Sequence, residues 1–204
     1  MPYVPGHVPQ ATGAEAEWRD CWAAVGAWGI DAASRGRVDL SPTDVRRLAR
    51  VPDDDGGTLA DMARAFVRKR LWRKRVRSGG KRRLSAQYLD DRTPAKMRAL
   101  FKAKPSGGGK LYLAESDFEV APNYAVCQPG FNKRRNAYHA IGIVPGEGKG
   151  KRKGMIRVMD PLCRKMTWWK IGDVIRAIRR YNDEMAHEKL GTADLIVVNV
   201  PDRR

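Results

Sequence analysis

Cysteine and histidine are scarce in this 204-residue chain, which has three of each. The cysteines, at Cys21, Cys127 and Cys163, are odd in number, widely spaced and without a CxxC pair. That pattern argues against a disulfide framework and against a zinc knuckle. One disulfide pair could still form, but reduced thiols are the expected state. No metal and no other cofactor is therefore expected, and the few histidines leave few candidates for a general base.

Long apolar segments are also missing. No run of the sequence approaches the length of apolar chain that a membrane-spanning helix needs. The N-terminus, "MPYVPGHVPQATG", has no basic start followed by an apolar stretch, so no signal peptide is expected. Internal repeats are absent as well. With 42% apolar residues, the composition predicts a soluble globular protein that can bury a core.

Acidic residues are outnumbered: 23 Asp and Glu stand against 40 Lys and Arg, for a net charge of +17. Such a balance predicts attraction to polyanions, whether nucleic acid, an anionic cell-wall polymer or an acidic protein surface. Two runs concentrate the charge, residues 68–83 and residues 149–154. No base-reading motif accompanies them, so any DNA binding is expected to be non-specific. The candidate polyanion-binding residues are Arg68, Lys69, Arg70, Arg73, Lys74, Arg75, Arg77, Lys81, Arg82 and Arg83.

Hydrophobic periodicity and turn residues divide the chain into an extended N-terminal arm, residues 1–13, and one domain, residues 14–204. The domain has a helical part, residues 14–70, followed by a part rich in strands, residues 71–204. Helices are expected at 14–33, 40–49, 58–69, 93–103 and 171–187. Strands are expected at 70–77, 110–116, 123–128, 136–145, 154–161 and 193–200. Helices first and an antiparallel meander afterwards indicate an α+β fold.

Three polar side chains form a candidate catalytic constellation. His139 begins a strand that is otherwise almost entirely apolar, and Asp160 ends the following strand. A hairpin between the two strands would bring the imidazole beside the carboxylate, which could fix its tautomer. Asp20 could cap a helix whose first turn begins at Cys21. There the helix dipole and a nearby imidazolium would both favour the thiolate.

The order of Cys21, the helical segment "GGTLADMARAF" and then "YHAIGIV", "IRVMDPL" and "WW" resembles the papain-like cysteine peptidases. The similarity extends from about residue 18 to residue 178 and is greatest to the bacteriocin-processing, double-glycine branch. The resemblance implies a papain-like fold in which Cys21 is the nucleophile, His139 the general base and Asp160 the orienting residue.

Two positions depart from that family's pattern. The family usually places a glutamine about six residues before the cysteine, where its amide contributes to the oxyanion hole; this chain has Glu15 there. Gln10 is the substitute candidate, although its spacing differs. The cysteine is commonly followed by a small residue, and here Trp22 follows it. Loss of one oxyanion donor typically slows an enzyme by a factor of about 10² to 10³, so a catalytically degenerate protein is the main alternative.

Two functions therefore remain open, with a third behind them. The first is a cysteine peptidase or amidase that cleaves peptide or peptidoglycan bonds. The second is a structural protein, such as a tail or head–tail connector component, that uses the fold as a scaffold. The third is a non-specific nucleic-acid binder. The chain also resembles peptidase-like proteins of tailed phages of actinobacteria, which implies a phage particle or the host cytoplasm as its location. The implied partners are other virion proteins, anionic cell wall or DNA.

Overall fold

The computed structural model describes residues 4–6, 20–52, 55–67, 86–104, 109–117, 138–163, 165–185 and 191–201. These form an α+β structure in which helices cover a six-stranded sheet. The α-helices are α1 (Cys21–Ser34), α2 (Pro42–Ala49), α3 (Leu59–Val67), α5 (Pro94–Lys102) and α7 (Ile171–Met185). A short 3-10 turn, η4 (Gly150–Arg152), interrupts one hairpin. The strands are β1 (Ala86–Leu89), β2 (Lys110–Asp117), β3 (Tyr138–Val144), β4 (Met155–Met159), β5 (Thr167–Lys170) and β6 (Leu195–Asn199).

The sheet has the strand order β1-β6-β2-β3-β4-β5, and each neighbouring pair is antiparallel. The final strand β6 therefore inserts between β1 and β2 instead of extending an edge. From β2 onward the strands β3, β4 and β5 follow in sequence order, joined as a meander. The antiparallel α+β architecture expected from the sequence is confirmed.

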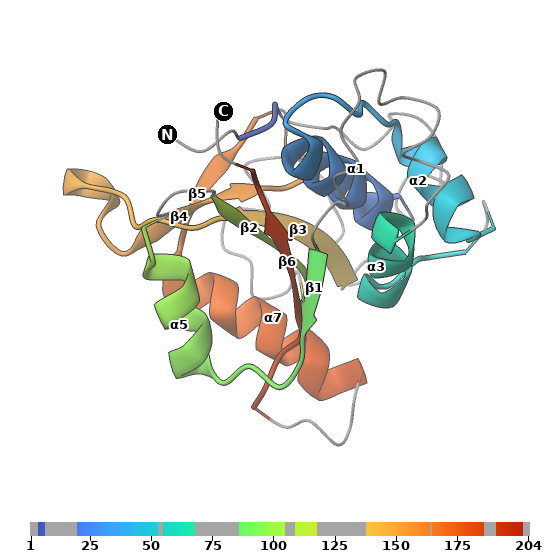
Figure 1. The fold of residues 1–204 in the computed structure, drawn as a ribbon. Helices are drawn as coiled ribbons and strands as arrows, with labels where there is room; N and C mark the ends of the chain where they lie inside the picture. Colours follow the sequence, from blue (N-terminus) through green and yellow to red (C-terminus); the bar gives the residue numbers. More distant parts are fainter. Residues whose placement is uncertain are drawn as a thin grey trace.

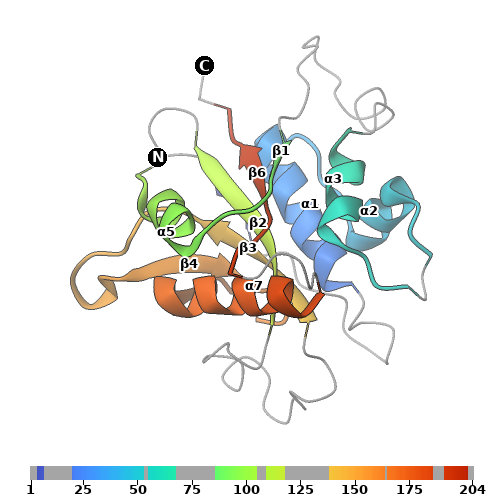
Figure 2. The same cartoon turned by 90° about the horizontal axis from the view of Figure 1, so that it is seen from below.

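Helices lie on both faces of the sheet. Helices α1, α2 and α3 cover one face, and α5 and α7 cover the other, as the two views of Figure 1 and Figure 2 show. Each face has its own hydrophobic core. One core is built around Trp22 and Trp28 of α1, and the other around Trp169, Tyr112 and Phe101. Burial of such large apolar side chains is the main favourable contribution to folding.

Local sequence explains where several helices begin. The Ser41 hydroxyl accepts a hydrogen bond from the backbone N–H of Asp44, and the Asp44 carboxylate accepts one from the backbone N–H of Ser41, a complete capping box ahead of α2. Thr93 caps α5 with a single hydrogen bond, which its hydroxyl accepts from the backbone N–H of Lys96, and a proline follows at the first helical position. Both starts agree with the sequence prediction. Among the described helices, none is long and apolar enough to cross a membrane.

Several secondary-structure elements differ from the sequence prediction or lie outside the described residues. Strands β1 and β5 were not expected from the sequence: β1 is a half-exposed edge strand of four residues, and the "TWWK" of β5 is equally short. Helix α1, by contrast, begins at Cys21, directly after Asp20, where the sequence predicted a helix start. The expected strands 70–77 and 123–128, the basic run 68–83 and most of the arm 1–13 lie outside the described residues.

Candidate active site

Cys21, His139 and Asp160 come together at one end of the sheet. Cys21 is the first residue of α1, His139 is the second residue of β3, and Asp160 directly follows β4. Helix α1 packs against β3. Strand β3 pairs with β2 along one edge and with β4 along the other. The spatial grouping expected from the sequence is thus present in the structure, and all three side chains are buried.

The imidazole of His139 is held by the carboxylate of Asp160. The ring atom Nε2 lies 2.8 Å from Oδ1 of Asp160. The same carboxylate oxygen accepts a hydrogen bond of 3.0 Å from the backbone N–H of Leu162, which fixes its position. Because Nε2 is used in this way, Nδ1 is the ring nitrogen left for the hydrogen bond between His139 and Cys21.

The electrostatic surroundings favour a protonated His139. Complete burial on its own would lower the pKa of this imidazole, but the charges and hydrogen bonds of Asp160 and Cys21 outweigh it and raise the pKa to about 9. An imidazolium between a carboxylate and a sulfur atom is the arrangement that stabilises a thiolate. The Asp160 carboxylate and the Cys21 sulfur therefore both favour the charged form of His139.

The backbone of β3 supports both partners. The amide N–H of Ala140 points to Sγ of Cys21 at 3.5 Å and would donate to a thiolate more strongly than to a thiol. Ser116, opposite His139 on β2, donates its hydroxyl hydrogen to the His139 carbonyl at 3.0 Å. Ser116 was not among the site residues predicted from the sequence, although a small polar residue late in a mostly apolar strand was a usable signal.

The side chain of Trp22, the bulky residue after Cys21, is buried in the core beneath the helical layer. Its ring lies against Gly57, where an added Cβ would come within 2.1 Å of the indole. The guanidinium of Arg46 lies 5.5 Å from the centre of the same ring. A bulky residue after the cysteine is thus accommodated by the helical layer.

Asp20 has a different role from the one expected. It occupies the N-cap position of α1, but its side chain makes no capping hydrogen bond. Its carboxylate is instead paired with the buried guanidinium of Arg46. Arg46 was not predicted from the sequence as a site residue, yet it is buried on α2 together with Val45 and Ala49.

The two described cysteines differ in oxidation state. Cys21 is a free thiol, whereas Cys163 is disulfide-bonded. The expectation that the thiols are all reduced is therefore wrong. An odd count and wide spacing carry no information on which residues the fold brings together, so the sequence pattern could not exclude one pair. Cys163 sits in the turn after Asp160 and donates its backbone N–H to the Asp160 carbonyl.

Gln10 and Glu15, the positions relevant to an oxyanion hole, lie outside the described residues, as do Arg68 to Arg83. In the part of the chain that the structure describes, no cluster of three or more His, Cys, Asp or Glu side chains is arranged to hold a metal ion.

Comparison with solved structures identifies the architecture. The chain matches the peptidase domain of Streptococcus ComA, a bi-functional ABC transporter of a quorum-sensing pathway, with a TM-score of 0.54 and 14% identity. The match covers 97% of this chain and 98% of that domain. The fold is papain-like.

Two further similarities are lower. A C39-like peptidase from Bacillus anthracis gives a TM-score of 0.46 at 11% identity, over 98% of this chain and 96% of that one. The Pseudomonas avirulence protein AvrPphB gives 0.37 at 10% identity, over 93% and 95%. No protein-family model matches the sequence, and no curated protein does. The papain-like fold implied by the resemblance is confirmed; the activity is a separate question.

Proposed function

We propose that this papain-like protein is a cysteine peptidase or amidase that cleaves peptide bonds or the peptide part of peptidoglycan. One observation carries the proposal: Cys21, His139 and Asp160 form a connected, buried chain of hydrogen bonds in the order nucleophile, base and orienting carboxylate. A buried histidine held this way costs solvation free energy, and that cost is more readily explained by chemistry than by packing.

The proposed reaction begins with the proton of Cys21 on His139. The thiolate attacks the carbonyl carbon of the substrate and forms a tetrahedral adduct. His139 then gives its proton to the nitrogen of the leaving amine, the C–N bond breaks, and a thioester on Cys21 remains. Water, deprotonated by His139, attacks the thioester and releases the acid and the regenerated thiol. Asp160 holds the imidazole in position and stabilises the imidazolium throughout.

The N-terminus of α1 supplies an electrostatic contribution to the same step. The first N–H groups of a helix have no partner within the helix, and their combined dipole favours negative charge. Asp20 does not use them through its side chain. Among the described residues no side chain caps these N–H groups, and they would stabilise negative charge on the sulfur or on the oxyanion of the adduct.

The activity test uses the full chain with peptides and peptidoglycan stem peptides, including a peptide that contains Gly-Gly, as in the branch that the sequence resembles. Mass spectrometry reads both cleavage and a covalent adduct with a peptide vinyl sulfone, an electrophile that requires a thiolate. We expect an adduct at Cys21 and none in Cys21→Ala. A protein that forms no adduct and cleaves no substrate would contradict the proposal and favour the catalytically degenerate scaffold.

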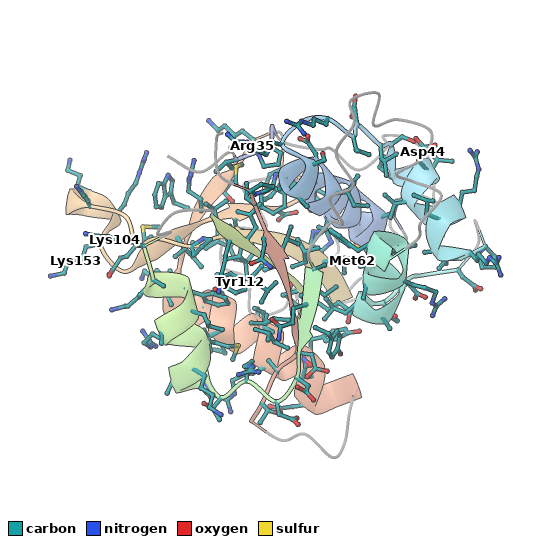
Figure 3. The ribbon with its side chains drawn as sticks, in the orientation of Figure 1. Arg35, Asp44, Met62, Lys104, Tyr112 and Lys153 are labelled. Carbon is teal, nitrogen blue, oxygen red and sulfur yellow. The ribbon has the colours of Figure 1, made fainter. Side chains whose placement is uncertain are left out.

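A second candidate function, docking on a polyanion, is favoured by an exposed basic surface in the described residues. The loop between β3 and β4 presents four exposed cationic side chains, and the end of α5 adds Lys102 and Lys104 beside it. Two contacts join the segments: Gly146 donates to the Phe101 carbonyl, and Lys102 approaches Glu147 at 3.7 Å. Figure 3 shows Lys104 and Lys153 at the end of the molecule away from Asp44. The loop residues are Lys149, Lys151, Arg152 and Lys153.

The loop is ordered by its own hydrogen bonds. Gly148 donates to the Met155 carbonyl across the hairpin, and the backbone of Gly154 donates to the carboxylate of Glu147. The guanidinium of Arg152 lies 4.8 Å from the ring centre of Trp168. A pre-ordered set of cations loses little conformational entropy on binding. The surface fits a linear polyanion such as DNA or a wall polymer, at the end of β3 opposite His139.

Neither candidate requires a particular source. A phage particle as the location, a role in its tail or connector, and partnership with other virion proteins are proposals that rest on sequence resemblance and composition. The papain-like fold is compatible with them and with other sources. The two candidate functions are also compatible with each other, because the basic surface and Cys21 occupy opposite ends of the sheet.

A further inference from the structure

Helix α1 begins differently from its neighbours. Side chains cap three of the described helices: Ser41 for α2, Thr58 for α3 and Thr93 for α5. Before α1 stands Asp20, a residue type well suited to capping, and its carboxylate is not used for that purpose. Among the described residues no side chain caps this start, and it is the start that carries Cys21.

The carboxylate of Asp20 is held by Arg46 of α2. Arg46 donates from Nε to Asp20 and from Nη1 to the carbonyls of Pro52 and Asp55 at 2.7 and 2.8 Å. Its side chain is 4% exposed and that of Asp20 is 18% exposed. The guanidinium also lies over Trp22, the residue after Cys21. One buried side chain therefore joins α2, the following loop and both residues that flank Cys21.

Such a buried ion pair is poor evidence for a stabilising role alone. Taking a guanidinium and a carboxylate out of water is costly, and apolar residues of similar size often serve stability equally well. The placement next to Cys21 suggests another reason. A carboxylate one residue from the sulfur repels a thiolate unless a cation compensates its charge.

We propose that Arg46 is a positioning residue for Cys21, which holds the Asp20 carboxylate away from the start of α1 and compensates its negative charge beside the thiolate. This inference rests on the proposed function, since it concerns the same sulfur atom. Charged groups lie around Cys21 from several elements: His139 from β3, Asp160 after β4, and the pair of Asp20 and Arg46 from α1 and α2.

The test is the pH profile of alkylation of Cys21 by iodoacetamide in the folded full chain, read on the peptide that contains Cys21. Loss of the cation in Arg46→Met should move the midpoint of the profile up by about 1 pH unit. Loss of the carboxylate in Asp20→Asn should move the midpoint down. The double variant should return to within a few tenths of a pH unit of the original protein. Opposite shifts from the two halves of one ion pair are a signature that general loosening does not produce.

Two further variants separate charge from structure. Arg46→Lys keeps the cation but cannot make all three hydrogen bonds, so its midpoint should lie nearer the original than that of Arg46→Met. Arg47→Met removes an arginine from the same helix whose side chain is 77% exposed, and it should leave the profile unchanged. Thermal unfolding of each variant identifies any that fails to fold, and Asp20→Asn with the double variant then carries the test.

The possible results distinguish a failure of this inference from a failure of the proposed peptidase function. Cys21 could be reactive while the midpoint of its alkylation profile is unchanged in Arg46→Met, or moves in the same direction in Arg46→Met and Asp20→Asn. Either result would overturn the inference and leave the proposed peptidase intact. A Cys21 that reacts after denaturation but is inert in the folded protein, with or without His139, would overturn both.

Discussion

Nε2 of His139 and Oδ1 of Asp160 lie 2.8 Å apart, although 21 positions separate the two residues in the sequence. The hairpin of β3 and β4 produces this proximity. Gly142 pairs with Met159 in the antiparallel register, so the start of β3 and the end of β4 lie at the same end of the hairpin. The hydrogen bond, and the burial around it, underlie the first two predictions.

Replacement of Asp160 by asparagine should remove the charge that keeps His139 protonated. The pKa of His139 should fall from about 9, because burial then dominates. Any peptide hydrolysis should fall by a factor on the order of 10² to 10⁴. Titration of the imidazole by NMR measures the first effect. Asp173→Asn, which affects an ion pair with Arg176 on α7, is the control; an unchanged His139 titration in Asp160→Asn would refute the prediction.

Folding stability should decline with rising pH because of His139. The folded state raises the pKa of this group from 6.5 to about 9, so the folded protein binds the proton more tightly than the unfolded chain does. The contribution is complete below pH 6.5 and disappears as the pH rises through 9. Urea midpoints at pH 6 and pH 9 measure it. In His139→Gln the difference between the two midpoints should be smaller, and equal differences in both proteins would count against it.

Glu115 should add a second, lower pH window. Burial raises the pKa of this carboxyl from 4.5 to about 7, with Asp61 and Asp194 adding to the effect, while hydrogen bonds with Tyr181 and the Leu59 backbone oppose it. The folded protein therefore holds a proton that the unfolded chain releases, and stability should fall between pH 4.5 and pH 7. Unfolding midpoints at pH 5 and pH 7 test this: the drop should shrink in Glu115→Gln, and an unaltered drop would exclude Glu115 as its source.

Gly142 sets the spacing between β3 and α1. A Cβ at this position would come within 2.6 Å of the Trp28 ring. Gly142→Ala should therefore destabilise the fold by about 1–3 kcal/mol through overpacking, and should disturb the approach of Cys21 to His139. Gly56→Ala is a matched control, since nothing lies within 4 Å of its added carbon. Chemical denaturation measures the free energy of unfolding of both variants. Similar values for Gly142→Ala and Gly56→Ala would contradict the prediction and mean that the Trp28 ring moves aside at little cost.

The basic loop between β3 and β4 should carry a measurable part of any polyanion affinity. Substitution of Lys149, Lys151, Arg152 and Lys153 by glutamine should weaken binding to a DNA duplex and to an anionic wall polymer. It should also reduce the dependence of affinity on salt concentration, because fewer counterions are released. Alkylation of Cys21 should not change. Unaltered affinity and salt dependence would assign the binding to other basic residues, such as Arg68 to Arg83.

Much of the architecture could be predicted from local patterns. The capping residues Ser41 and Thr93, each followed by proline, mark two helix starts. The apolar run after His139 and the "DP" after β4 indicated the hairpin that brings the imidazole to the carboxylate. These features are readable because they depend on neighbours in the sequence.

Other features depend on distant contacts and were not predictable. The edge strand β1 exists because it pairs with β6, and its four residues carry no clear alternation. The disulfide at Cys163 has no local signature. Asp20 seemed suited to capping α1, but Arg46, 26 positions away, competes for its carboxylate. Tertiary ion pairing thus overrides a local preference, at the residue that precedes Cys21.

The central claim, that His139 activates Cys21, is tested most directly by the pH dependence of Cys21 alkylation in the folded protein and in His139→Ala. The proposed ion pair predicts a thiolate that reacts well below pH 7 and reacts far more slowly at that pH once the imidazole is removed. Identical profiles in the two proteins, with the midpoint near the value of about 8.5 for an ordinary thiol, would contradict the account.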